Sequence, residues 1–212
     1  MKDTDILFII SKIFNDYDEK NGVIQKVDYT QRAKDIIDAW QSVNNQGLNI
    51  ELICKLHRII CNNEDIAIND EQGNIIGYTK AGEYRTHPSS RKSELHNGKR
   101  TLFFPPEQIK QRMHYLTTTM NSVFASNQSK DMMIENIVAF TVEFLTVHPF
   151  ANQNGRLAQV LMELFAFKLG IEPFNISFIL TNYKHELIKS LEEIRNYKNI
   201  NSFLILQNKA MH

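Results

Sequence analysis

The segment HPFANQNGRLAQ, residues 148–159, combines residue types that suit the chemistry of phosphate-containing groups. His148 is the side chain in it that titrates near neutral pH, so it can take a proton from a hydroxyl. Arg156 carries a fixed charge on a planar fork of donors, and Gly155 allows a phosphate to approach the backbone. A base, a cation and accessible backbone amides predict transfer of a phosphate-containing group onto a hydroxyl.

Two strongly apolar segments flank this motif, and we predict that they form the helices that position it. Residues 134–147 and 157–169 are apolar on most sides, which is typical of buried helices. Pro149 disfavours the α conformation at His148, so the first helix should end there. The second should begin near Asn154 or Gly155, and its unpaired N–H groups and dipole predict an anion site.

Each residue of the motif also has a simpler explanation when it is taken alone. His148 could pack in the core or cap a helix, Arg156 could form a structural salt bridge, and Asn154-Gly155 could be an ordinary turn. The combination of all of them between two apolar helices favours a functional site.

The rest of the chain predicts a mainly α domain. Apolar residues recur at helical spacing in residues 6–13, 33–40 and 50–61, and polar residues near 15–22 predict the end of the first helix. Further helices are predicted from Pro105-Pro106 to about Phe124, after a Ser129 N-cap, and over residues 182–196. Residues 62–74 are polar and turn-rich, and Asn97-Gly98 predicts one β-hairpin before residue 104. We predict a single domain over 1–212, with a core over about 45–206 and the helices of 1–44 packed on it.

Composition narrows the classes of function. Lys and Arg number 24, as do Asp and Glu, so no net charge attracts nucleic acid or a membrane surface. No apolar run is long enough for a transmembrane helix, and the run at residues 6–10 lacks the features of a signal peptide. Cys54 and Cys61 fit no metal or redox spacing and are predicted to be buried free thiols. We expect a cytoplasmic protein; delivery into another cell without a cleavable signal stays open.

The motif resembles the signature of the Fic family (filamentation induced by cyclic AMP), H-x-F-x-[D/E]-G-N-G-R-x-x-R. The matching residues are His148, Phe150, Asn154, Gly155 and Arg156. LNIELICKLHRII is similar to a family helix that carries Leu-His, and AGEYRT with the later FFPPEQI is similar to the family's flap. The resemblance covers about residues 45–206 and implies a helical bundle with a small β-hairpin flap.

The resemblance also implies an activity and roles for residues. Family members typically transfer AMP from ATP, with Mg²⁺, to a Ser, Thr or Tyr hydroxyl of a target protein. His148 would be the base, Phe150 the anchor of the loop, and Arg156 the group that holds the terminal phosphates. The phosphate-binding positions would be Gln153, Asn154, Gly155 and Gln159. The flap would align the target by strand addition; its candidate residues are Gly82, Tyr84, Arg85, Thr86, Arg91, Lys99 and Arg100.

Three positions differ from the family signature and leave two interpretations open. Asn152 replaces the acidic metal ligand, Gln153 replaces a glycine, and Gln159 replaces the last arginine. An uncharged amide should hold Mg²⁺ more weakly. One interpretation is an active transferase of AMP or of another group, such as UMP, phosphocholine or phosphate. The other is a weak or inactive module of the same fold that binds nucleotide or protein.

Three further expectations concern regulation and individual residues. The family's inhibitory pattern [S/T]-x-x-x-E-[G/N] is absent from the sequence, so a separate inhibitor or antitoxin protein is a candidate partner. His57 is expected to pack or cap within the fold. Tyr84 and Arg85 are expected either to steady the flap or to meet the nucleotide base. The oligomeric state stays open.

Overall fold

The computed structural model describes residues 3–20, 29–43, 47–70, 72–92 and 100–176, together with residues 179, 182, 186, 189, 190, 193, 202, 203 and 205. It is mainly α, as predicted. Its helices are α1 (Asp3–Lys20), α2 (Thr30–Gln41), α3 (Ile50–Ile60), α4 (Pro106–Ala125), α5 (Lys130–Val147) and α6 (Asn154–Lys168). Its strands are β1 (Ile66–Asn69), β2 (Ile75–Thr79), β3 (Ser90–Lys92) and β4 (Arg100–Leu102).

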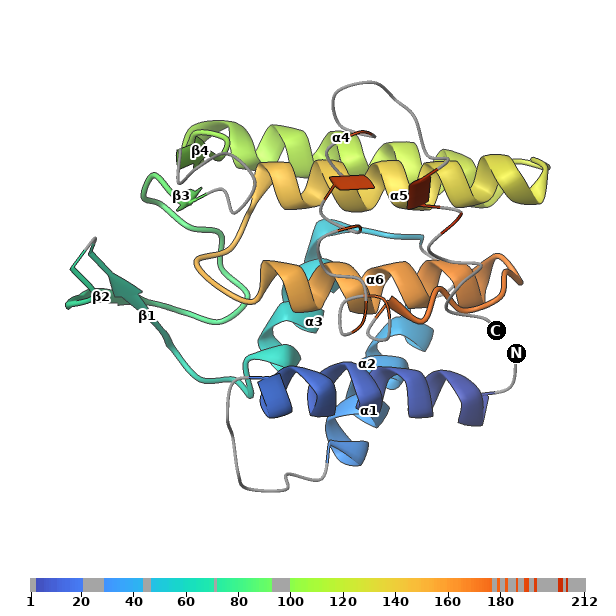
Figure 1. The fold of residues 1–212 in the computed structure, drawn as a ribbon, viewed down its shortest axis with the longest axis horizontal. Helices are drawn as coiled ribbons and strands as arrows, with labels where there is room; N and C mark the ends of the chain where they lie inside the picture. Colours follow the sequence, from blue (N-terminus) through green and yellow to red (C-terminus); the bar gives the residue numbers. More distant parts are fainter. Residues whose placement is uncertain are drawn as a thin grey trace.

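The long helices form successive layers (Figure 1). α4 packs on α5, α5 on α6 and α6 on α1, while α2 joins α1 to α3, which in turn contacts α6. The apolar segment predicted after the motif becomes α6, whose side chains from Leu157 to Ala166 are nearly all buried. The two helices that flank the motif are therefore central, and the loop between them is anchored on both sides.

Local signals in the sequence account for most helix boundaries. The Ser129 side chain accepts a hydrogen bond from the Met132 N–H and caps α5 as predicted. Asn49 caps α3 through the Leu52 N–H at 2.8 Å. α1 ends at Lys20, within the polar stretch 15–22 where its end was predicted. Within residues 182–196, each residue that the structure describes is helical.

The described residues form two antiparallel hairpins rather than the single one predicted. β3 pairs with β4 antiparallel, with Arg91 opposite Thr101, and this hairpin is the predicted flap. β1 pairs with β2, with Ala67 opposite Tyr78, and β1 lies in residues 62–74, which had been expected to be turn-rich. The β1–β2 hairpin projects away from the helices (Figure 1). The Asn97-Gly98 turn lies outside the described residues.

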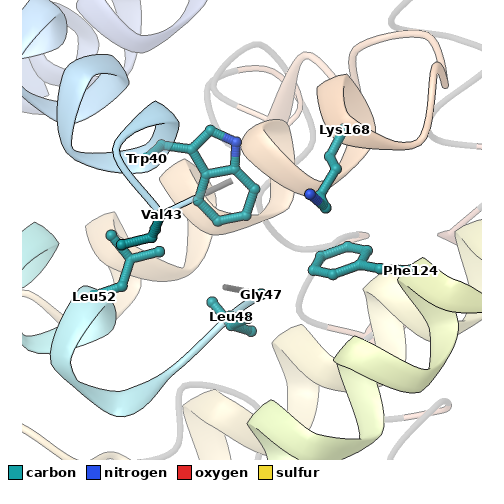
Figure 2. Close-up of a pocket in the computed structure, with 7 residues that line it drawn as sticks. All are labelled: Trp40, Val43, Gly47, Leu48, Leu52, Phe124 and Lys168. Atoms are coloured by element: carbon teal, nitrogen blue, oxygen red, sulfur yellow. The ribbon is translucent and has the colours of Figure 1, made fainter. Parts of the chain in front are cut away.

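A small apolar cavity marks the end of the core opposite the motif. Figure 2 shows Trp40, Leu52 and Phe124 around it, with Lys168 at the end of α6 reaching over Phe124. The cavity volume is about 10 Å³, which leaves room for no more than about one water molecule. It is therefore a packing defect and not a ligand site. Among the described residues, no helix combines the length and apolar character that a membrane span requires.

Glu163 is an ionisable group inside the core. It is fully buried on α6, and its carboxylate accepts hydrogen bonds from the N–H groups of Phe174 at 3.0 Å and Ile176 at 3.3 Å. Burial raises its pKa to about 7, although these N–H groups act in the opposite direction. The carboxyl group thus ties the chain after α6 to the core.

Glu163 should make the stability depend on pH. Because its folded pKa is raised from 4.5 to about 7, its contribution is fully present at low pH and is lost as the pH rises through about 7. We expect a loss of about 3 kcal/mol, which Glu163→Gln should not show. Denaturant unfolding of both proteins at about pH 5 and about pH 8 measures the difference. An identical pH dependence for the two proteins would contradict the assignment.

Candidate active site

The motif loop, residues 148–153, begins with a residue in a costly conformation. α5 ends at Val147, and His148 follows it in the left-handed region with φ 50 and ψ 61. Its N–H still donates to the Phe144 carbonyl at 2.9 Å. A left-handed conformation costs a residue other than glycine about 1–2 kcal/mol, so surrounding contacts must hold it. The predicted end of the helix at His148 is confirmed.

Asn154 holds the loop in shape from within. Its Oδ1 accepts the Phe150 N–H at 3.0 Å, and its Nδ2 donates to the Phe150 carbonyl at 2.7 Å. The side chain is buried and committed to the loop. Any share that Asn154 has in an anion site must therefore come from its backbone N–H.

His57 of α3 contacts the motif loop at Phe150 and Asn152. Its ring stacks on the buried Phe150 ring with centroids 3.8 Å apart and an angle of 8°. Its Nδ1 accepts the Gly82 N–H at 2.9 Å, so the ring proton must lie on Nε2, which is 3.1 Å from the Asn152 carbonyl. Burial lowers the pKa of His57 to about 4, which keeps the ring neutral. The expectation that His57 packs within the fold is confirmed, and its bridge between the flap and the motif loop is new.

Position 82, whose N–H donates to His57, requires a glycine. It has φ 84, and a Cβ there would lie 2.7 Å from the Cys54 carbonyl oxygen. A side chain would therefore push the turn away from α3 and break its hydrogen bond to His57.

Arg85 binds the flap to the end of α5. Its Nε donates to the His148 carbonyl at 2.7 Å, and one terminal nitrogen donates to the Val147 carbonyl at 3.2 Å and to that of Phe104. The other donates to the His87 carbonyl at 2.8 Å. The side chain is 1% exposed, so it cannot touch a target. Of the two roles expected for Arg85, steadying the flap fits this geometry.

A residue that was not singled out in the sequence covers the face of His148. The Phe103 ring stacks on the imidazole with centroids 3.8 Å apart and an angle of 4°. Phe103 is fixed in turn, because its N–H donates to the Ser89 carbonyl at 3.1 Å beside the β3–β4 pair. The stack covers one face of the imidazole and fixes the plane of the ring.

The first turn of α6 offers open space for an anion. Gly155 is exposed, and a Cβ there would meet nothing within 4 Å. Packing therefore does not require a glycine, although glycine costs a helix about 1 kcal/mol relative to alanine. A close approach by a ligand would explain the residue. The backbone dipole at this end of α6 favours a negative charge.

Gln153 stands at a position whose backbone suits glycine. It is the N-cap of α6 with φ 60 and ψ 9, in the left-handed region, and its side chain is half-buried. This explains why the family signature has a glycine here. The replacement puts both strain and a side chain beside the first turn of α6.

Gln153→Gly should therefore leave the stability unchanged or raise it by up to about 1 kcal/mol, and should strengthen the nucleotide binding that the sequence predicts at the first turn of α6. Asn63→Gly is the matched control, because Asn63 also has positive φ, 59, but lies at the end of α3. Thermal unfolding and nucleotide titration of both variants measure the effects. A gain in affinity for Asn63→Gly as well would show that the effect is not local to the motif.

Arg156 is in the first turn of α6, and its side chain points into the protein rather than to the surface. Its side chain is 6% exposed, and its guanidinium carbon lies 5.1 Å from the centre of the Phe14 ring of α1. Gln159, one turn further along α6, is half-buried.

The residues present do not fit a Mg²⁺ ion held by the protein. Asn152 is exposed, and its Oδ1 already accepts the Gln153 N–H at 2.8 Å. Within the part of the chain that the structure describes, no three His, Cys, Asp or Glu side chains converge as metal ligands would. One neutral amide oxygen is a poor site for a hard divalent cation.

The predicted flap residues divide into two groups. Gly82 and Arg85 are buried, and the half-buried Tyr84 has its ring 5.4 Å from that of Phe150, so these three lie under the flap. Thr86 is exposed, and Arg91 and Arg100 lie on the paired strands. Lys99 lies outside the described residues. The paired strands that carry Arg91 and Arg100 are where a target could add a strand.

Residues 47–166 match the model of the Fic/DOC family. The fold is similar to that of a Fic-domain signalling protein from Bacteroides thetaiotaomicron, with 17% identity, TM-score 0.64, and coverage of 95% of this chain and 81% of the other. It is also similar to BepC from Bartonella tribocorum, solved with AMPPNP (18%, TM-score 0.54, 86% and 85%). A third similar structure is Fic-1 (aa134–508) from C. elegans (18%, TM-score 0.58, 99% and 61%). No curated protein matches.

Proposed function

Because this chain belongs to the Fic/DOC family, we propose that it transfers AMP, or another phosphate-containing group, from a nucleotide to a Ser, Thr or Tyr hydroxyl of a target protein. His148 is the general base in this proposal. The first turn of α6 receives the phosphates, and the flap receives the target.

The observation that supports the proposal most strongly is the way the motif loop is held. Asn154 fixes it from within, His57 holds it from α3, and Arg85 holds it from the flap. These contacts maintain two left-handed residues, His148 and Gln153, at the ends of the loop. Strain that is maintained from three sides at a candidate base and a helix N-terminus indicates a preorganised site.

The chemical step needs little beyond positioning. The target hydroxyl gives its proton to an edge nitrogen of His148 while its oxygen attacks the α-phosphorus. The bond from that phosphorus to the bridging oxygen breaks, and pyrophosphate leaves with the bonding electron pair. Phe103 keeps the imidazole plane fixed, while the amides at the start of α6 and the charge of Arg156 offset the charge on the phosphates.

Nucleotide as the donor is supported by similar structures. BepC was solved with AMPPNP, and a Fic domain from Bartonella quintana with ADP (13% identity, TM-score 0.52). The open space over Gly155 suits a phosphate. Because Asn152 does not fit a protein-held Mg²⁺, no step in this proposal passes through a metal.

The test is labelling of a cell lysate by the full chain, with ATP, UTP, CTP and CDP-choline each carrying the label in the group to be transferred. We expect one donor to label a protein. His148→Ala should lower the rate by about 10²- to 10⁴-fold, because that is the usual contribution of a general base. Circular dichroism checks that the variant is folded. Equal labelling by parent and variant would contradict the role of His148.

The second candidate is a module that binds without chemistry, and the strained Gln153 and the engaged Asn152 favour it. In that case the triple variant Asn152→Asp, Gln153→Gly, Gln159→Arg should label the lysate where the parent does not. A parent as active as the triple variant would exclude this candidate.

A further inference from the structure

Hydrogen bonds on both sides hold the backbone of Phe103, which directly follows strand β4. Its own N–H donates to the Ser89 carbonyl at 3.1 Å, beside the pairing of Ser90 with Leu102. The carbonyl of the next residue, Phe104, accepts a hydrogen bond from a buried arginine that also holds the end of α5. The Phe103 ring is therefore presented to the motif loop by a fixed part of the flap.

This ring lies flat against the imidazole of His148. The two half-buried rings have centroids 3.8 Å apart and planes at 4° to each other. Two neutral aromatic rings favour offset or edge-to-face contacts, with centroids about 4.5–7 Å apart. A positive charge is instead attracted to the face of a ring, where the negative potential of the ring lies. The contact between Phe103 and His148 should therefore become more favourable once His148 carries a proton.

A second stack in the site has nearly the same geometry but involves a different histidine. The rings of His57 and Phe150 lie 3.8 Å apart at 8°. Nδ1 of His57 accepts the Gly82 N–H, and burial lowers the pKa of this ring to about 4, so it stays neutral. Packing can thus hold a neutral imidazole in this arrangement. What distinguishes the stack on His148 is the proton that His148 gains in the proposed step.

We propose that Phe103 is a positioning residue that also stabilises the protonated form of His148 during transfer. The inference rests on the proposed function, because His148 gains the proton only as the general base. An interaction that strengthens towards the transition state raises the rate of the chemical step and leaves donor binding nearly unchanged. The flap then takes part in the chemistry, since β4, where a target strand could pair, ends directly before Phe103.

The experiment replaces Phe103 in the full chain with mono-, di- and trifluorophenylalanine. Fluorine withdraws electrons from the face of the ring but changes its shape little, so a purely structural contact would respond little. We measure labelling of the lysate protein as the concentration of the active donor is varied. The maximal rate should fall stepwise along the series, by about three- to ten-fold in all, while the KM for the donor changes less than about two-fold.

Two natural substitutions and one control series accompany these variants. Phe103→Trp keeps a strongly attracting ring face and should retain more activity than Phe103→Leu, which should lose about ten-fold or more. The control is the same fluorine series at Phe104, whose ring faces the Arg112 guanidinium at 4.7 Å instead of the base. That series should leave the rate unchanged.

NMR of the His148 ring tests the stack without any transfer. The ring signals, assigned by their loss in His148→Ala, should be displaced by the aromatic ring of Phe103. Phe103→Leu should remove this displacement. Ring signals that do not respond to Phe103→Leu would show that the stack does not form, whatever the activity of the protein.

The kinetic outcomes separate this inference from the function on which it rests. Equal rates across the Phe103 series in an active protein would overturn the inference and leave the proposed function intact. An equal loss in the Phe104 series would show that fluorine acts through packing of the flap. A rise in the donor KM that matches the fall in rate would assign Phe103 to donor binding instead. A parent that labels nothing with any donor would overturn the proposed function, and this inference with it.

Discussion

Replacing Arg85 with methionine should destabilise the protein by about 4 kcal/mol and lower its melting temperature by roughly 10 °C. The change removes the donor for four carbonyls, those of Val147, His148, His87 and Phe104. The guanidinium is buried, so water cannot readily replace it. Methionine fills a similar volume, which limits the contribution of a cavity to the loss.

Activity should fall along with stability. The His148 backbone loses one of the contacts that hold it left-handed, and the segment that carries Phe103 is released from α5. A displacement of about 1 Å at the base can cost on the order of 10²-fold in rate. The rate should be measured well below the melting temperature of the variant, so that the loss is not caused by global unfolding.

Arg112→Met is the matched substitution for this test. Arg112 is exposed and stacks on the ring of Phe104, whose carbonyl Arg85 binds. Its loss should cost less than about 1 kcal/mol. Arg85→Lys keeps the charge but cannot form the same fork, so it should fall between the parent and Arg85→Met. Similar melting temperatures for Arg85→Met and Arg112→Met would contradict the role of Arg85.

The helices and the interruption at the motif could be predicted because their causes are local. Apolar periodicity predicted the helices that became α2 to α6, and Pro149 predicted the end of α5. The end of α1 had a local cause as well, since the helix stops at Lys20, within the polar stretch 15–22.

The contacts that complete the candidate site could not be predicted, because each joins segments far apart in the chain. His57 to Asn152, Arg85 to His148 and Phe103 to His148 depend on how α3 and the flap approach the end of α5. Residue spacing carries no information on such distances. The left-handed backbone at Gln153 was hidden as well, since glutamine is not a residue type that signals positive φ.

The His57 bridge should make the protein sensitive to acid. Its folded pKa is lowered from 6.5 to about 4, so its contribution is fully present above pH 6.5 and is lost as the pH falls towards 4. We expect a loss of about 3 kcal/mol over this range. Protonation places a hydrogen on Nδ1, which then can no longer accept the Gly82 N–H. Glu163 acts in the opposite direction between about pH 4.5 and 6.5, so Glu163→Gln should reveal the His57 effect more fully.

Two amide variants separate the two hydrogen bonds of His57. The oxygen of His57→Asn can take the place of Nδ1 and accept the Gly82 N–H, while the longer His57→Gln can reach the Asn152 carbonyl instead. Each should cost about 2–3 kcal/mol at pH 7, since one buried partner and the stack on Phe150 are lost. Neither titrates, so their disadvantage should shrink as the pH falls and the parent loses its own bridge. If His57→Asn lowers the transfer rate more than His57→Gln at equal stability, the hold on the motif loop is the part that positions His148. The reverse order would assign that role to the flap turn, and a disadvantage independent of pH would contradict the neutral bridge itself.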